Sequence, residues 1–127
     1  MRRSRRGASA IEFALCLPVV VALLTGILDW GAYLSAMHEA QSAAREGVRL
    51  GAATDQDEDP VTLAENRVAD RLAEAGVKGS GVATLSGLSP DQVMTVTVSG
   101  SYSPFVGLVP VPSTVNGAMT MRMEDQP

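Results

Sequence analysis

Residues 11–28 read IEFALCLPVVVALLTGIL, an apolar run that decides how this chain folds. As a helix rising about 1.5 Å per residue, a run of this length extends about 27 Å, close to the roughly 30 Å hydrocarbon core of a bilayer. The apolar character continues, diluted by Asp29, as far as Leu34. We therefore predict a membrane-spanning helix over about residues 11–34 rather than a buried helix of a soluble domain.

The segment before this run is strongly basic, since residues 1–7 hold four of the ten basic residues and none of the acidic ones: Arg2, Arg3, Arg5 and Arg6. Basic flanks stay in the cytoplasm, which predicts an inner-membrane protein with its N-terminus inside and its C-terminus outside. A cleaved secretory signal fits less well, because no small-residue cleavage site closes the run. A lipoprotein signal also fits poorly, because Leu15 precedes Cys16.

Glu12 is a carboxylate at the start of the apolar run, where a charge is costly. One interpretation places it at the level of the lipid headgroups, ionised and paired with Arg6 or with lipid. The other interpretation depends on Gly7 and Ala8. Cutting the chain after Gly7 would make Glu12 the fifth residue of a mature protein.

The basic leader, Gly7 and the Glu12–Phe13 pair resemble the prepilin-peptidase site of type IV pilins, in the form used by Flp (Tad) pili. Three further motifs extend the match: Leu-Pro at 17–18, GILDWG at 26–31 and AAREG at 43–47. Over about residues 5–53 the chain is similar to the TadE-like pseudopilin family of tight-adherence pili. Phe13 stands where the family often has Tyr, and Asp29–Trp30 where Glu-Phe is common.

This resemblance implies that a prepilin peptidase removes the leader by cutting between Gly7 and Ala8. Glu12, next to Phe13, would then neutralise the new α-amino group of Ala8 on a neighbouring subunit. The implied partners are other pilins and pseudopilins, the Tad inner-membrane assembly platform and the lipid bilayer. The implied role is that of a minor pilin in an extracellular pilus, supporting pilus biogenesis and adhesion. The alternative is an uncleaved, single-pass membrane-anchored scaffold or partner-binding protein of a secretion complex.

The helix is predicted to continue beyond the membrane, because apolar or small residues recur on one helical face: Tyr33, Met37, Ala40, Ala44 and Val48. Small residues that permit close helix packing lie at Ala36, Ala40, Ala44 and Gly47. They pack either on the chain's own domain or on neighbouring helices in a filament. Trp30 and Tyr33 are placed where interfacial aromatic residues are expected. Pro18 predicts a kink or a partially melted turn, and His38 a solvent-facing residue.

Residues 54–60 form an acidic stretch whose D-x-D-x-D spacing is also found in calcium loops. The sixth position would be Pro60 and the twelfth Asn66, so a solvated linker is the better interpretation. A helix is expected next, with an apolar stripe at Val61, Ala64, Val68, Leu72 and Ala75. Asp59 or Thr62 can cap its start, Thr62 with Glu65 matches a capping box, and Gly76 closes it.

Alternation of apolar and polar residues predicts a strand through Met94, Val96 and Val98, and a second through Met119, Met121 and Met123. Residues 82–85 are a candidate third strand. The predicted fold class is α+β. A leader (residues 1–7) precedes a long N-terminal transmembrane, pilin-like helix (residues 8–53). A small C-terminal head (residues 54–127) then contains one short helix and an antiparallel sheet.

Composition argues against several classes of function. Aromatic residues make up 4% of the chain and its net charge is −4, which disfavours a nucleic-acid partner. One cysteine excludes an internal disulfide framework, and one histidine leaves few metal or acid–base constellations. We therefore expect no enzyme, no catalytic set, no metal site and no cofactor.

Overall fold

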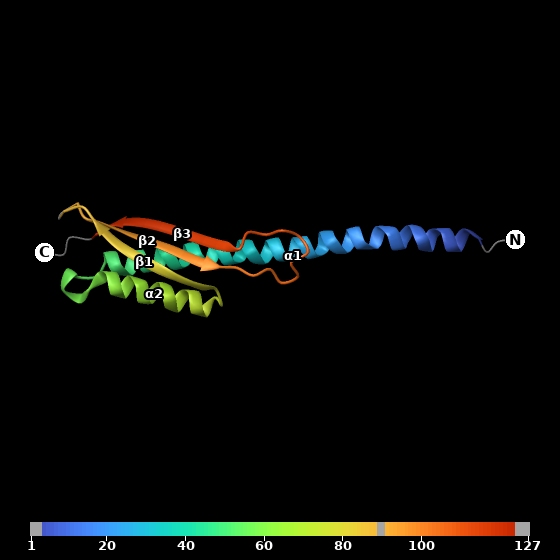
Figure 1. Cartoon of the computed structure of the whole chain (residues 1–127). Helices are drawn as coiled ribbons and strands as arrows, with labels where there is room; N and C mark the ends of the chain where they lie inside the picture. The colour runs from blue at the N-terminus through green and yellow to red at the C-terminus, as the bar shows by residue number, and fades with distance from the viewer. Residues whose placement is uncertain (1–3, 89–90, 124–127) are drawn as a thin grey trace.

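The computed structural model describes residues 4–88 and 91–123, with the side chains of residues 4–6 and 56 left out. A long helix, α1 (Ser4–Ala52), carries the head on its C-terminal half, while its N-terminal half projects alone (Figure 1). The head consists of η1 (Gln56–Glu58), α2 (Pro60–Glu74), β1 (Lys78–Ser86), β2 (Val93–Ser101) and β3 (Thr114–Arg122). The predicted α+β fold class is thus confirmed. Arg2 and Arg3 of the leader lie outside the described residues.

The long helix is continuous through Pro18. A partially melted turn, one of the two forms predicted there, is therefore wrong. Proline removes a single backbone donor from the helical hydrogen-bond ladder. The remaining hydrogen bonds on either side are enough to keep α1 as one helix.

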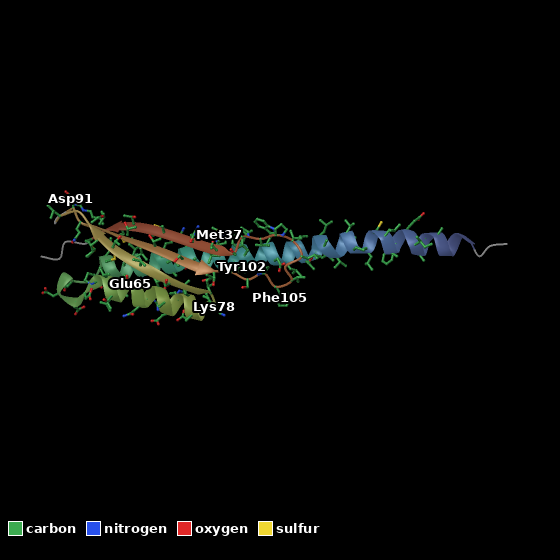
Figure 2. The ribbon with its side chains drawn as sticks, in the orientation of Figure 1. Met37, Glu65, Lys78, Asp91, Tyr102 and Phe105 are labelled. Carbon is green, nitrogen blue, oxygen red and sulfur yellow. The ribbon has the colours of Figure 1, made fainter. Side chains whose placement is uncertain are left out.

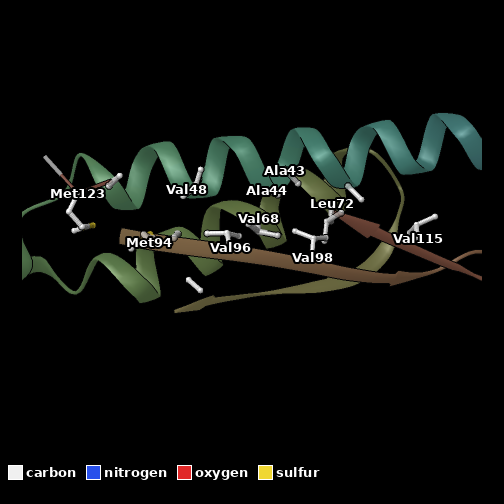
Figure 3. Close-up of a cluster of buried hydrophobic side chains, with 14 of the residues drawn as sticks. Ala43, Ala44, Val48, Val68, Leu72, Met94, Val96, Val98, Val115 and Met123 are labelled. Atoms are coloured by element: carbon white, nitrogen blue, oxygen red, sulfur yellow. The ribbon is translucent and has the colours of Figure 1, made fainter. Parts of the chain in front are cut away.

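The three strands form an antiparallel sheet in the order β1-β2-β3. In its register, Val96 of the central strand lies between Ala83 of β1 and Met119 of β3. Helix α1 packs against β2 and β3, and α2 packs against β1, so both helices cover one face of the sheet. The core lies between these two layers (Figure 3).

The predicted alternation in β2 is confirmed, because Met94, Val96 and Val98 are all fully buried. In β3 the buried face begins earlier than predicted, at Val115 and Gly117.

The methionines of the third strand are less buried than their alternation suggested. Met119 is half-buried and Met121 is 42% exposed, whereas Met123 is buried just beyond the strand. Met121 lies in an open depression beside Ala52, where α1 ends and no longer covers the sheet.

Helix α2 has most of the predicted apolar face, with Ala64, Val68 and Leu72 buried and Val61 half-buried. Ala75, also predicted in this face, is exposed and lies just beyond the helix. The N-cap of α2 is Asp59, whose carboxylate accepts hydrogen bonds from the Thr62 hydroxyl at 2.7 Å and the Thr62 N–H at 3.3 Å. These bonds, the hydroxyl bond foremost, lower the pKa of Asp59.

The predicted capping box between Thr62 and Glu65 is wrong. The Glu65 carboxylate accepts the Ala83 N–H of β1 at 3.0 Å instead. The Glu65 side chain bonds to the edge strand of the sheet, and not to the start of its own helix, because α2 lies directly against β1. Glu65 therefore joins the second helix to the sheet.

Candidate functional site

The four residues of the predicted processing and assembly site lie on the free half of α1. Gly7, Ala8, Glu12 and Phe13 are all exposed, and Phe13 is 68% exposed. Within the described side chains, none forms an ion pair with Glu12. This end of the helix is therefore accessible along its whole circumference.

The free half of α1 has the length and composition of a membrane span. The candidate helix covers residues 7–52, and only 6% of its most apolar window is buried against the rest of the chain. Exposed leucine, isoleucine and valine side chains of this kind are unfavourable in water. They therefore indicate an apolar environment around the N-terminal half of the helix.

The predicted packing residues lie on the head-bearing half of α1. Ala40, Ala44 and Gly47 are buried, and Ala36 is half-buried. They face the chain's own α2 and sheet, since an added Cβ on Gly117 of β3 would lie 2.7 Å from the Ala40 carbonyl oxygen. In this structure these small residues, which we call the small-residue ridge, pack against other parts of the same chain.

The two helices approach each other closely at Gly47. A Cβ added there would lie 2.5 Å from Val68 Cγ2 and 3.0 Å from the Ala64 carbonyl oxygen. We expect Gly47→Ala to destabilise the head by about 1–3 kcal/mol through overpacking, although alanine favours a helix by about 1 kcal/mol. Urea unfolding of the detergent-solubilised chain measures the change.

Gly31→Ala is the matched control, because an added Cβ at Gly31 meets nothing within 4 Å. It is expected to leave the stability of the head unchanged or slightly raised. Equal urea midpoints for the parent and the Gly47→Ala chain would show that the α1–α2 contact is looser than described.

The AAREG motif at residues 43–47 also supplies charge pairing between the helices. Glu46 contacts Arg67 and Arg71 of α2, each at 3.0 Å. Arg71 also pairs with Glu74 at 2.7 Å. This hydrogen bond, followed by the charge of Glu46, raises the pKa of Arg71. Arg45, in contrast, is exposed.

Asp29 is a site residue that sequence reasoning missed. Its side chain is fully buried although it follows directly on the apolar run of α1. One carboxylate oxygen accepts the N–H groups of Phe105 at 2.8 Å and Val106 at 3.0 Å, and the other accepts that of Gly107 at 2.8 Å. Successive N–H groups around one anion form a backbone nest. Asp29 therefore fastens the loop between β2 and β3 to the long helix.

Two aromatic residues reinforce this attachment, and one of them, Tyr102, is labelled in Figure 2. The Tyr102 hydroxyl donates to the Asp29 carbonyl oxygen at 3.1 Å, and the Tyr102 ring packs edge-to-face on Tyr33 at 5.6 Å between ring centroids. Tyr33 is 8% exposed, so the chain's own residues cover most of its side chain. Trp30 keeps 42% exposure and packs on Tyr33 at 5.8 Å.

The remaining polar candidates do not converge on a site. Asp55, Asp57 and Glu58 of the acidic linker are exposed. In the part of the chain that the structure describes, no group of three or more His, Cys, Asp or Glu side chains is placed to hold a metal ion. His38 is exposed, as predicted.

Comparison with family models supports the resemblance drawn from the motifs. Residues 7–49 match the model described as TadE-like protein, a segment that includes Gly7, Glu12, Asp29 and the AAREG motif. Comparison with curated proteins and with solved structures gives no match. The family indicates a protein associated with the Tad pilus and its other components, of a structural rather than enzymatic kind. Together with the apolar helix, it also indicates membrane anchoring. The similarity of this chain to TadE-like proteins therefore lies in its N-terminal segment, residues 7–49.

Proposed function

We propose that this chain is a minor pilin of a Tad pilus, made as a membrane-anchored precursor and assembled through the N-terminal half of α1. The observation that carries this proposal is the separation of the molecule into a packed head and a bare apolar helix (Figure 1). In the precursor the bilayer covers this helix, with its N-terminus in the cytoplasm. In the pilus, helices of neighbouring subunits take the place of lipid.

The residues available for contact between subunits are those that the head leaves uncovered. Ala40, Ala44 and Gly47 are already buried by packing within the chain. The exposed apolar side chains between residues 11 and 28 are not. We therefore assign the filament contacts to this part of α1, where burial of apolar area would drive association.

Processing by a prepilin peptidase, the second element of the proposal, is assigned to the bond between Gly7 and Ala8. The matched family segment begins at Gly7, and an added Cβ on this glycine meets nothing within 4 Å. A protease would thus approach the backbone here without displacing any part of the head.

Glu12 is proposed to act electrostatically once the leader has been removed. Cleavage creates an α-amino group on Ala8, about 6 Å from Glu12 along the axis of the same helix. Pairing with the Ala8 amino group of an adjacent subunit places two opposite charges together in the apolar filament interior. Such a pair is less costly to bury than either charge alone.

Glu12→Gln tests this role. We expect membrane insertion to be intact or easier, because a charge is removed from lipid. Incorporation into sheared pili should fall, because the Ala8 amino group loses its counter-charge. The measurement compares precursor cleavage, membrane content and pilus content in fractionated cells.

Glu58→Gln is the matched control, since it removes an exposed carboxylate from the head. Its pilus content should equal that of the parent. Efficient entry of the Glu12→Gln chain into pili would contradict the proposed salt bridge and leave Glu12 as an interfacial carboxylate.

A further inference from the structure

The loop between β2 and β3, residues 102–113, reads YSPFVGLVPVPS and lies against the apolar helix rather than against the sheet (Figure 1). Asp29 holds its backbone. Its Val109 side chain lies 3.0 Å from the position that a Cβ would take on Gly26. The contacts of this loop with α1 thus extend below the packed core of the head.

These contacts coincide with the end of the membrane span. A hydrocarbon core about 30 Å thick takes about 20 helical residues, so a span that begins at Ile11 ends near Trp30. Gly26 and Asp29 therefore fall within its last five residues. Trp30, with 42% of its surface exposed, is of the type enriched at this boundary.

The loop presents an apolar surface at this level. Residues 92–121 contain no charged side chain. Phe105 is 88% exposed, and Val106 and Leu108 are 48% and 59% exposed. Exposed Ile27 and Leu28 of α1 continue the same apolar character at the same level of the helix. A bilayer that covers these helix residues would extend over the loop.

The backbone of the loop is also suited to a region poor in water. Non-helical backbone is tolerated at membrane depth only where its polar groups are satisfied by the protein. Asp29 accepts three consecutive N–H groups, those of residues 105–107. The three prolines of the loop contribute no N–H at all. The N–H groups of residues 105–107 in turn compensate the buried negative charge of Asp29.

We propose that Phe105, Val106 and Leu108 insert into the leaflet at the C-terminal end of the α1 span, so that this loop is a second membrane contact of the head. The occupant of the apolar surface is lipid, because the surface is continuous with the lipid-covered helix. This inference depends on the membrane anchoring in the proposed function, but not on cleavage or pilus assembly.

The single tryptophan of the chain makes the depth of the loop measurable. The full chain is reconstituted in phosphatidylcholine vesicles with or without bromine on the acyl chains, which quenches tryptophan fluorescence at the depth of the hydrocarbon. The native chain reports on Trp30. In a Trp30→Phe background, Phe105→Trp reports on the loop, and Leu88→Trp is the matched control.

The control is close, because Leu88 is 87% exposed and Phe105 is 88% exposed. Leu88 lies where β1 leaves the sheet, at the opposite end of the head. We expect the F105W chain to lose emission as strongly as native Trp30, and the L88W chain to lose none.

The other outcomes overturn the inference in distinguishable ways. If native Trp30 is quenched but the F105W chain is not, the loop is in water and membrane anchoring survives. If neither is quenched, the anchoring itself fails. A blue shift of the F105W emission that depends on the protein-to-lipid ratio, without quenching, would assign the loop surface to a second copy of the chain.

Discussion

A chain carrying Gly7→Leu is expected to accumulate as an uncleaved precursor and to be absent from sheared pili. The physical reason is local, because the leucine side chain would stand beside the bond that the peptidase must reach. It would also stabilise the helix there by about 0.8–1 kcal/mol, which opposes the unwinding that cleavage requires. Intact-mass spectrometry of the membrane-extracted protein measures whether residues 1–7 are present.

Gly31→Leu separates these effects from a general disturbance of α1. Gly31 and Gly7 are both exposed glycines of this helix, and an added Cβ at either meets nothing within 4 Å. The Gly31→Leu chain should therefore begin at Ala8, as the parent does. Normal cleavage of the Gly7→Leu chain would contradict the assigned site, whereas a failure of both variants would point to membrane insertion instead.

Removing the Asp29 carboxylate by Asp29→Ala is expected to release the β2–β3 loop from α1. Three backbone donors, at residues 105–107, lose their common acceptor. Hydrogen bonds to a charged acceptor are stronger than those between neutral groups. We expect amide exchange of these residues to rise by about 100-fold or more, with no change in β2. Hydrogen exchange of the detergent-solubilised chain, read by mass spectrometry, makes the comparison.

Asp29→Asn should give an intermediate increase, because the amide keeps one carbonyl acceptor. Asp91→Ala is the control for loss of an aspartate elsewhere in the head, since Asp91 is exposed and pairs with Arg122 on the surface. Exchange in the loop that is unchanged by Asp29→Ala would show that the Tyr102 contacts alone hold the loop.

The periodic elements of this protein could be predicted from its sequence. The buried face of α1 is the predicted one, because Ala40, Ala44 and Val48 are fully buried and Tyr33 nearly so. The same holds for Ala64, Val68 and Leu72 of α2 and for the alternation in β2. Each of these depends on a repeat of 3.6 or 2 residues, which neighbouring positions along the chain are sufficient to define.

Features that depend on distant segments could not be predicted in this way. Glu65 matched a local capping box, but the Ala83 N–H of β1 takes its carboxylate because the sheet lies against α2. The small-residue ridge fitted packing within the chain as well as packing between chains. Only the close approach of Gly117 in β3 to Ala40 showed that the head packs against this ridge.

The sequence by itself determined that an apolar helix with a basic N-terminal segment precedes a small α+β head, and it singled out Gly7 and Glu12 on that helix. Only the tertiary structure decided the role of Asp29. Its three donors lie 76 to 78 residues further along the chain, and no local pattern links a carboxylate to backbone N–H groups so distant. The pairing arises because β2 and β3 pack on α1 and bring their connecting loop to the residues that follow the apolar run of this helix.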